Sequence, residues 1–476
     1  MSTLRLSHRH LRRLVTPIAL ALAFITSPGV RASVQLIAVG SLDAHGADKA
    51  VQTAAPLENG MPENELGGLG SGLVQLGCDR FLALPDRGPN ALQFNSAVSN
   101  TTSYIARFQT LDLRLEPRST GILKFTVVPT LKATTLLWSP TPLVYGDGET
   151  AGLRSGVPAL NHAGHDYFTG RSDNFAADAD SIQATAARLD PEGIRVSSDG
   201  KQVFISDEYG PTVRVFDRTS GRQRRVLSLP HLLAVPHPAS STSQELHDND
   251  RGRVANHGIE GLAISPDNRT LFAIMQGALL QDGGKHAGIT RLLRIDLQTG
   301  AVTQYAYPLD RIEHAGHVSY TGASDLLAVN DHRLLILERG SHGMGAASKA
   351  SDKRVYAIDL VGATPIGDHE GEAKLRPLAL QKTLFVDLVA ALTAAGERAE
   401  DIPEKIEGLA FGPPVRIEGK PKNTLYLSSD NDFMPEVKDH LHPTGHANPN
   451  RFFVFAFSPT DLPGSRPASE PSICSR

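Results

Sequence analysis

Residues 191–208, PEGIRVSSDGKQVFISDE, contain the unit that decides the fold. It consists of an acidic residue and a glycine, an apolar run, a turn, and a second apolar run that ends in carboxylates. The unit recurs as IEGLAISPDNRTLFAI at 259–274 and as IEGLAFGPPVRIEGKPKNTLYLSSD at 406–430. Each copy predicts a pair of strands. Recurrence of this kind is typical of repeat architectures, because one such unit cannot bury both faces of its sheet alone.

Weaker copies begin at Gly67 and Ser324, so the repeats extend over residues 65–457. A short alternating segment that ends in aspartate follows several copies, as at 213–217 and 292–296. Three strands are therefore visible in a unit, and a fourth fits in the variable stretches. This pattern predicts an all-β β-propeller with four-stranded antiparallel blades, six blades being favoured over seven. A stacked β-solenoid is the alternative, but its coils are far shorter than these spacings.

The first 32 residues predict an export signal. A basic start with Arg12-Arg13 precedes the apolar run 14–25, and Val30-Arg31-Ala32 offers the small residues that a signal peptidase reads. The apolar run is too short to span a bilayer, which favours cleavage after Ala32 over an anchor. We expect a periplasmic or secreted protein that does not span the membrane. Both the general and the twin-arginine export routes stay open.

Residues 33–476 are predicted to form one propeller domain, because no low-complexity linker divides them. The stretches 218–257 and 360–404 are expected insertions, the second with an amphipathic helix over 384–394. Loss of residues 1–32 removes five arginines and no acid, which changes the formal charge from −4 to −9. This charge argues against nucleic acid as a partner and suits a cation. A monomer is expected.

Three glutamates occupy equivalent positions in the repeat, namely Glu192, Glu260 and Glu407. The innermost strands of all blades run the same way along the axis, so such residues would form a ring at one mouth. Converging carboxylates repel one another, and raised pKa values, basic partners or a bound hard cation resolve the repulsion. Oxygen ligands favour calcium over zinc. The alternative is that each glutamate caps backbone N–H groups of a turn.

Further charged residues stand at the ends of the next strands. Arg87 and Arg339 hold matching places in two units, and guanidinium groups bind phosphate or carboxylate in a bidentate way. Inter-blade ion pairs are the alternative interpretation of these residues. Four acids would add metal ligands to the same mouth: Asp207, Glu208, Asp430 and Asp432.

Histidines and cysteines give weaker indications. Solvated loop residues are the favoured interpretation of His162, His165, His314, His317, His440 and His442, whereas Asn256-His257 would lie beside the ring. Cys78 and Cys474 are the only cysteines. A disulfide would tie the two ends of the ring together, and two separate thiols are the equally weighted alternative.

Five ordered motifs resemble those of exported bacterial proteins named for the esterase-like activity of phytase. They are DPEGI at 190–194, SDEYGP at 206–211, EGLAISPD at 260–267, LILER at 335–339 and EGLAFGP at 407–413. The resemblance covers residues 65–457, is weak between 91 and 165, and implies a phytase-like β-propeller. Phosphoester hydrolysis is the activity that it implies as an expectation.

Two hypotheses of different classes follow. In the first, the chain is a calcium-dependent hydrolase of a small phosphorylated or ester substrate. The three glutamates and the two arginines are its catalytic groups, and the metal or an ionised carboxylate activates the attack. A metal-dependent lactonase or esterase would use the same ring. In the second, the chain is a non-catalytic propeller that binds a ligand or an envelope protein at the same mouth. Several chemistries lose support because no Gly-x-Ser-x-Gly, His-Glu-x-x-His or Gly-x-x-x-x-Gly-Lys motif is present.

Overall fold

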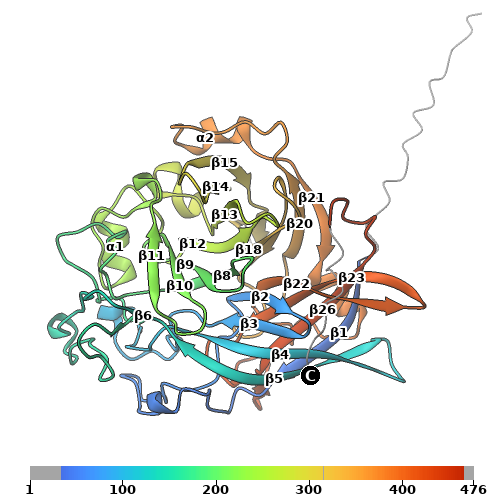
Figure 1. Cartoon of the computed structure of the whole chain (residues 1–476), viewed down its shortest axis with the longest axis horizontal. Helices are drawn as coiled ribbons and strands as arrows, with labels where there is room; N and C mark the ends of the chain where they lie inside the picture. The colour runs from blue at the N-terminus through green and yellow to red at the C-terminus, as the bar shows by residue number, and fades with distance from the viewer. Residues whose placement is uncertain (1–33, 315, 466–476) are drawn as a thin grey trace, which may run out of the picture. The chain divides into compact units, whose positions relative to one another are not determined.

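The computed structural model describes residues 34–314 and 316–465, and the predicted export signal lies outside this part of the chain. Five four-stranded antiparallel sheets surround one axis (Figure 1). Their inner strands contact one another in the closed order β2, β8, β12, β18, β22 and back to β2. The protein is therefore a β-propeller of five blades, and the expectation of six or seven is wrong.

The blades follow the chain in order, except that β1 completes the last one. The first blade consists of β2 (Gly72–Gly77), β3 (Arg80–Leu84), β4 (Arg107–Pro117) and β5 (Phe125–Leu136), and the second of β8 (Pro191–Val196), β9 (Gln202–Asp207), β10 (Thr212–Asp217) and β11 (Gln223–Leu227). The third blade consists of β12 (Ile259–Ile264), β13 (Thr270–Met275), β14 (Ile289–Asp296) and β15 (Val302–Pro308), and the fourth of β18 (Gly322–Ala328), β19 (Arg333–Arg339), β20 (Lys353–Asp359) and β21 (Lys382–Asp387). The fifth blade consists of β22 (Lys405–Ile417), β23 (Lys420–Asp430), β26 (Asn450–Phe457) and β1 (Gln35–Leu42).

The described residues contain no sixth blade. The region 91–165, where the resemblance is weak, contains β4 and β5 of the first blade and the start of a long connection. The long segment 137–190 contains only two strands of two residues each, β6 (Trp138–Ser139) and β7 (Asp166–Tyr167). It lacks the alternating apolar runs of four to eight residues that a blade strand needs to cover its neighbours. This segment forms a loop structure beside the first and second blades instead.

Strand β1 closes the ring. It pairs antiparallel with β26, from Gln35 opposite Ala456 to Leu42 opposite Asn450. The N-terminal strand thus completes a blade whose other strands come from the C-terminal part of the chain. Cys474 lies outside the described residues, so the disulfide between Cys78 and Cys474 stays a prediction.

The shorter elements lie in the connections. The helix expected over 384–394 begins later, because 384–387 belongs to β21 and Asp387 accepts a hydrogen bond from Ala390 N as the N-cap of α3. The remaining elements are α1 (Thr242–Asp248), α2 (Glu372–Leu375), α3 (Leu388–Ala394), β16 (Arg311–His314), β17 (His317–Tyr320), β24 (Glu436–Val437), β25 (His446–Ala447), and the 3-10 turns Val51–Thr53, Ser96–Val98, Glu149–Ala151, His231–Leu233, Leu280–Asp282, Gly284–His286 and Arg376–Leu378.

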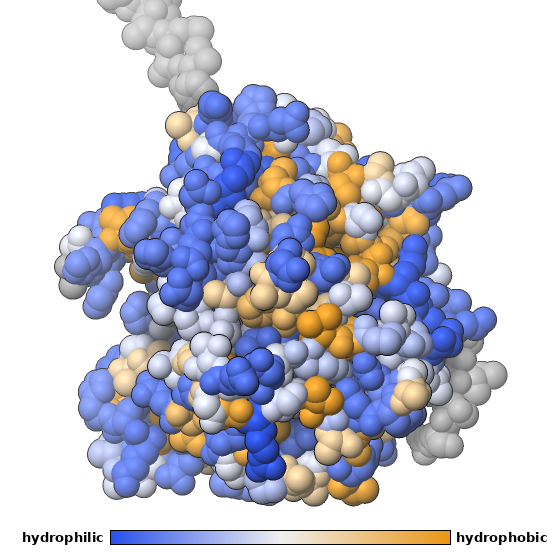
Figure 2. Space-filling model, turned by 90° about the vertical axis from the view of Figure 1, so that its left-hand side faces the viewer, coloured by the Kyte–Doolittle hydropathy of each residue, from blue (hydrophilic) through white to orange (hydrophobic). Residues whose placement is uncertain are grey.

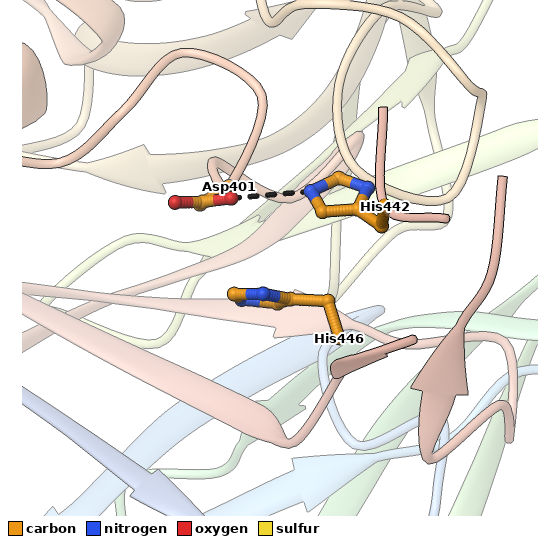
Figure 3. Close-up of side chains that lie close together, drawn as sticks. All are labelled: Asp401, His442 and His446. Carbon is orange, nitrogen blue, oxygen red and sulfur yellow. Dashed lines mark hydrogen bonds and ion pairs between the residues drawn. The ribbon is translucent and has the colours of Figure 1, made fainter. Parts of the chain in front are cut away.

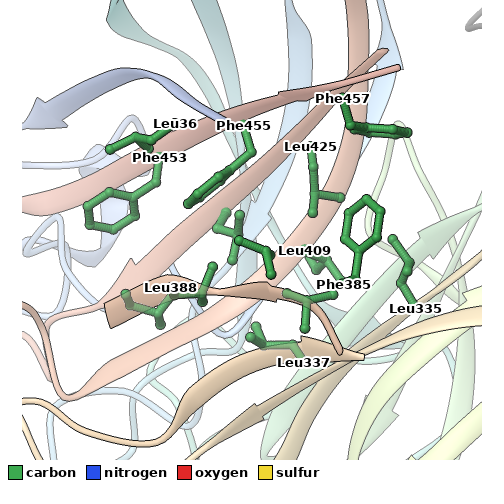
Figure 4. Close-up of a cluster of buried hydrophobic side chains, with 14 of the residues drawn as sticks. Leu36, Leu335, Leu337, Phe385, Leu388, Leu409, Leu425, Phe453, Phe455 and Phe457 are labelled. Atoms are coloured by element: carbon green, nitrogen blue, oxygen red, sulfur yellow. The ribbon is translucent and has the colours of Figure 1, made fainter. Parts of the chain in front are cut away.

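Five apolar clusters fill the five interfaces between neighbouring blades. Because successive side chains of a strand point to opposite faces of its sheet, one strand supplies side chains to the interfaces with both neighbouring blades. In β19, Leu334 and Ile336 pack against the third blade, whereas Leu335 and Leu337 pack against the fifth. Figure 4 shows the second of these interfaces, in which Leu335 and Leu337 of β19 belong to one cluster with Leu409 of β22 and Phe453 and Phe455 of β26. Second strands such as β9, β13 and β19 are buried on both faces, which explains their nearly continuous apolar composition. Outer strands such as β5 and β11 are partly exposed.

The large exposed apolar side chains are spread along the described chain. On the face drawn in Figure 2, apolar patches alternate with hydrophilic side chains. The exposed large apolar residues are Val51, Leu92, Ile122, Val144, Val157, Val318, Val361 and Leu384. No helix among the described residues has the length and hydropathy that crossing a bilayer requires.

Candidate active site on the propeller axis

The repeated glutamates lie at β-bulges of the inner strands. The pairing of β12 with β13 shifts register between Ile259 and Gly261, which places Glu260 in the bulge. The same shift surrounds Glu407 in β22, and a longer one surrounds Glu192 in β8. A bulge re-aims the side chain of its extra residue, which is why strand pairing continues while the carboxylates turn to the axis.

The glycine after each glutamate is required by close approach of the inner strands. A Cβ on Gly261 would lie 2.6 Å from Asp325 Cα, and one on Gly193 would lie 2.8 Å from Leu262 N. A Cβ on Gly408 would lie 2.9 Å from the carbonyl oxygen of Gly70. The Glu-Gly repeat therefore combines a residue aimed at the axis with one that lets adjacent blades meet.

Replacement of Gly261 by alanine is expected to destabilise the protein by about 1–3 kcal/mol, because its Cβ would push against backbone rather than a movable side chain. Urea unfolding measures the effect. Gly46→Ala is the matched control, since no atom lies within 4 Å of the added Cβ. Equal unfolding midpoints for the two variants would contradict the packing argument.

Carboxyl groups from four of the blades or their flanking loops gather where the inner strands begin and the second strands end, and the fourth blade contributes Arg339 at the end of β19. One small cavity of about 40 Å³ is lined by Asp86, Arg87, Glu192, Glu208, Asn256, Glu260, Gln276, Arg339, Lys405, Glu407 and Asp430. Asp190 and Asp432 adjoin this cavity, because each groups with Asp86 within 4.8 Å. We call these thirteen residues the acidic mouth.

The carboxylates of the acidic mouth outnumber its cations, which are Arg87, Arg339 and Lys405. Oxygen atoms of Glu192, Glu208 and Glu260 all lie within 4.8 Å of one another. Oε2 of Glu208 and Oε2 of Glu260 are buried without a hydrogen-bond partner. Arg87 Nη1 lies 3.6 Å from the oxygen of Glu208, beyond hydrogen-bond distance. Buried carboxylate oxygens without hydrogen bonds are costly, so the trio has the geometry of a hard-cation site.

Burial and mutual repulsion raise the pKa values of the trio. Burial and the neighbouring Glu260 raise the pKa of Glu192 well above its ordinary value. Burial and Glu208 do the same to the pKa of Glu260. Burial and Asp190 raise the pKa of Glu208 to about 8, against the pull of Arg87. At neutral pH the trio therefore keeps protons until a cation replaces them.

Four of the other five acids of the mouth are paired, and Asp86 forms no ion pair among the described residues. Glu407 forms an ion pair of 2.5 Å with Arg339. Asp430 lies 3.0 Å from Lys405, which also contacts Asp432. Burial raises the pKa of Asp430 to about 7 despite this partner. The three repeated glutamates therefore have different partners. Glu192 and Glu260 lie close to Glu208, whereas Glu407 is neutralised by the guanidinium group of Arg339.

Asp207 is the predicted ligand that the structure places elsewhere. Its carboxylate accepts hydrogen bonds from Thr212 Oγ1 at 3.0 Å and from Tyr209 N at 3.1 Å, and Arg214 lies 3.8 Å away. It stabilises the turn after β9, while the next residue, Glu208, enters the mouth. The period-two alternation of side chains explains why adjacent acids separate in this way.

Sequence reasoning did not nominate Asp86, Asp190, Gln276 or Lys405. Asp86 and Asp190 stand beside nominated residues, so their proximity to Arg87 and Glu192 was the available signal. Gln276 donates to Glu260 Oε1 at 2.7 Å, and its place after β13 matches that of Glu208 after β9. Lys405 directly precedes Ile406-Glu407-Gly408 and has no counterpart in the other copies, which left no pattern to detect.

A buried ion pair lies on the propeller axis below the acidic mouth. Arg195 of β8 lies 2.8 Å from Asp325 of β18. The same guanidinium group donates to the carbonyl oxygens of Leu73 in β2, Leu326 in β18 and Leu409 in β22. Asp325 occupies the position that glycine holds in the Glu-Gly copies. This pair closes the axis below the acidic mouth.

The histidines take several environments. His165 stacks on Trp138 with ring centroids 3.7 Å apart, and His314 pairs with His317 in the β16–β17 hairpin. Asn256 lines the acidic mouth, whereas His257 lines a neighbouring cavity, where burial lowers its pKa to about 4. The pair Asn256-His257 thus contributes one residue to the mouth.

Asp401, His442 and His446 form a separate cluster (Figure 3). His442 is buried, contrary to the expected solvated loop residue. Its Nε2 lies 3.1 Å from Asp401 and its Nδ1 lies 3.1 Å from Asp439. Because a carboxylate faces each ring nitrogen, contacts with Asp401 and Asp439 account for the burial of His442.

The fold and the mouth define a class of protein: a five-bladed propeller with a carboxylate-rich polar site on its axis. The family model described as "Phytase-like: Esterase-like activity of phytase" matches residues 64–433. The chain belongs to this family.

A curated relative is the "Uncharacterized secreted protein" of Arthroderma benhamiae (strain ATCC MYA-4681 / CBS 112371), which is 30% identical over 253 residues. The alignment covers 47% of this chain and 45% of the relative, so the chain spans less than half the length of that protein.

Solved propellers are similar at low identity. The Pseudomonas aeruginosa periplasmic gluconolactonase PpgL is 12% identical, with 88% of this chain and 95% of that chain covered and a TM-score of 0.32. The major Malassezia sympodialis allergen Mala s 1 is 12% identical, with 84% and 80% covered and a TM-score of 0.33. At these TM-scores the likeness carries no argument about activity.

Proposed function

We propose that this protein is an exported, calcium-dependent hydrolase that acts on phosphate esters or related esters at the acidic mouth. One observation carries the proposal: three glutamates present oxygens within 4.8 Å of one another, and two of these carboxylates have a buried oxygen without a hydrogen-bond partner. Family membership supports an ester substrate. The negative charge expected after export suits attraction of a cation.

Glu192, Glu208 and Glu260 would hold the calcium ion. Their oxygen-only donor set fits a hard cation, and a bound calcium ion would polarise a phosphoryl or carbonyl oxygen. The glutamates must lose their protons to hold it, since their raised pKa values describe the cation-free state. Calcium binding should therefore release protons.

The two arginines are placed to bind the oxyanion of the substrate. Arg87 contacts Asp190 and lies 3.6 Å from Glu208, and Arg339 pairs with Glu407. Nε of each guanidinium group is buried without a hydrogen-bond partner, which leaves a donor for a phosphate or carboxyl oxygen. These donors would stabilise the negative charge that develops as water attacks.

Asp86 is the group that we assign to proton transfer. Burial and the neighbouring Asp430 raise its pKa well above the ordinary value, so it keeps a proton at neutral pH. It lies in one group with Glu192, within 4.8 Å. A protonated carboxyl at this position can donate to the leaving alkoxide oxygen while water adds to the phosphorus or carbonyl carbon.

The test is a calcium titration of the chelator-treated protein by calorimetry, followed by assays with phosphomonoesters, phytate and simple carboxyl esters. Glu192→Gln keeps the volume and removes a charge, so calcium affinity is expected to fall about tenfold or more, which corresponds to about 1.4 kcal/mol. Hydrolysis should fall with it.

Glu63→Gln is the matched control, because Glu63 is a largely buried glutamate that pairs with Arg107 away from the mouth. It should leave calcium affinity unchanged. Calcium binding without turnover of any ester would instead favour the non-catalytic ligand-binding propeller. Absence of calcium binding at millimolar concentrations would sink the hydrolase mechanism as stated.

A further inference from the structure

A second, larger cavity adjoins the acidic mouth. Its volume is about 140 Å³, and Arg87 and Asn256 line both cavities. Three guanidinium groups border it, those of Arg87, Arg188 and Arg253. We call it the arginine pocket. Its charge contrasts with that of the mouth, although the two share a wall.

Arg188 has unmet hydrogen-bonding capacity. Its side chain is only 2% exposed, and its Nε and Nη2 are buried without a hydrogen-bond partner. Nη1 donates to the carbonyl oxygen of Ser172 at 3.4 Å, and the nearest carboxylate, that of Glu245, lies 3.9 Å away. Leaving two donors of a buried charge unpaired is costly, which indicates a missing acceptor.

Aromatic rings hold this guanidinium group in place. Its carbon lies 4.5 Å from the ring centroid of Phe175 and 5.2 Å from that of Tyr209. Such stacking fixes the plane of the group and leaves its edge free for a planar or tetrahedral oxyanion. The arrangement therefore pre-organises Arg188 rather than neutralising it.

Arg253 and Arg87, the other two arginines of the pocket, contact groups other than the free donors of Arg188. Arg253 pairs with Glu245 and donates to the carbonyl oxygen of Tyr209 at 3.0 Å. Glu245 is thus the single acid that lines the pocket, and its closest ion pair is with Arg253. Arg87 pairs with acids of the mouth, and its Nε is buried and unpartnered.

The size and the remaining walls fit one small polar group. A volume of about 140 Å³ is well below that of pockets for whole ligands, which are on the order of 300–1,000 Å³. Hydroxyl groups supply further hydrogen-bonding atoms for the same kind of guest. They belong to Ser99, Thr101, Ser172, Ser240 and Thr242.

We propose that the arginine pocket binds an oxyanionic group of the substrate, a phosphate or a carboxylate, while the scissile ester lies in the acidic mouth. The inference rests on the proposed function for the role of the mouth, and it names the substrate class: esters that carry a second anionic group. The shared wall formed by Arg87 and Asn256 places the two groups side by side. Substrates without the second anion lose this anchor.

Binding of the probe is measured on the chelator-treated full chain, by calorimetry with inorganic phosphate and, in a second arm, with acetate. Saturable binding with one site per chain is expected, and the tighter of the two probes identifies the oxyanion. Arg188→Gln should weaken it about tenfold or more, as expected for loss of a charged hydrogen-bond donor.

Arg214→Gln is the matched control. Arg214 is equally buried, its Nε also lacks a hydrogen-bond partner, and it stacks on Phe168 away from the pocket. This variant should bind the probe as the unmodified protein does. Should Arg188→Gln fail to fold, Arg188→Lys keeps the charge, gives up the planar fork and should still weaken binding.

No saturable binding of either anion, or an equal loss in the Arg188 and Arg214 variants, would overturn the proposal. Because calcium and an ester are absent from this titration, its result is independent of hydrolysis. Failure of the proposed function would appear as ester assays without turnover while phosphate or acetate still binds. Failure of the pocket would appear as turnover that does not depend on a second anionic group in the substrate.

Discussion

Replacement of Asp325 by asparagine is expected to destabilise the folded protein by about 3–5 kcal/mol, because it leaves the charge of Arg195 buried without its partner. Burial raises the pKa of Asp325 to about 6 even though Arg195 opposes the rise. Desolvation thus offsets much of the attraction within the pair. The large effect comes from the orphaned guanidinium group, not from a strong ion pair.

A double-mutant cycle measures this coupling. Arg195→Met alone should also be destabilising, since Asp325 then loses its charged partner in a fully buried position. The combination of both changes should cost at least about 3 kcal/mol less than the sum of the single effects. Urea unfolding at pH 7.5 gives the three free energies. If the destabilisations of the two single variants simply add up in the double variant, the ion pair of Arg195 and Asp325 does not couple the inner strands.

Calcium is expected to raise the free energy of unfolding by about 4 kcal/mol when its concentration is about a thousand times its dissociation constant. Without calcium, stability should fall as the pH rises from 6 to 9. A carboxyl group whose pKa is raised by folding binds more protons in the folded state, so its stabilisation is present below the unfolded pKa and lost toward the folded one. For Glu208 this window extends to a pH of about 8.

Thermal unfolding in chelator and in calcium, at both ends of the pH range, tests this expectation. Glu208→Gln removes one titrating group and one ligand, so it should flatten the pH dependence and reduce the effect of calcium. The exposed Glu116, which pairs with Arg114 at the end of β4, offers Glu116→Gln as a control without either effect. A chelated protein whose midpoint rises with pH over this range would refute the argument.

The repeat copies were sufficient to predict the blade architecture but not the number of blades. All five inner strands carry a recognisable unit, including the weak copies near Gly67 and Ser324. The connection 137–190 between the first and second blades has the length of a blade but not its alternation, so chain length overstates the number of blades. Strand β1 was not recognised either, because its partner β26 is remote in sequence and a single eight-residue strand has no repeat to identify it.

What the sequence determined by itself is which positions recur: an acid before a glycine at the start of an inner strand, and a charged residue at the end of the next. Local bulge geometry and chain alternation follow from those residues, so Glu192 and Glu260 could be assigned to the axis. Tertiary structure alone decided which charges became partners. Arg339 neutralises Glu407, Glu208 rather than Asp207 joins the trio, and Arg188, which lines the same pocket as Arg87, keeps two donors without a hydrogen-bond partner. Ion pairs and desolvation depend on distances of a few ångströms between segments far apart in the chain, and sequence spacing does not specify those distances.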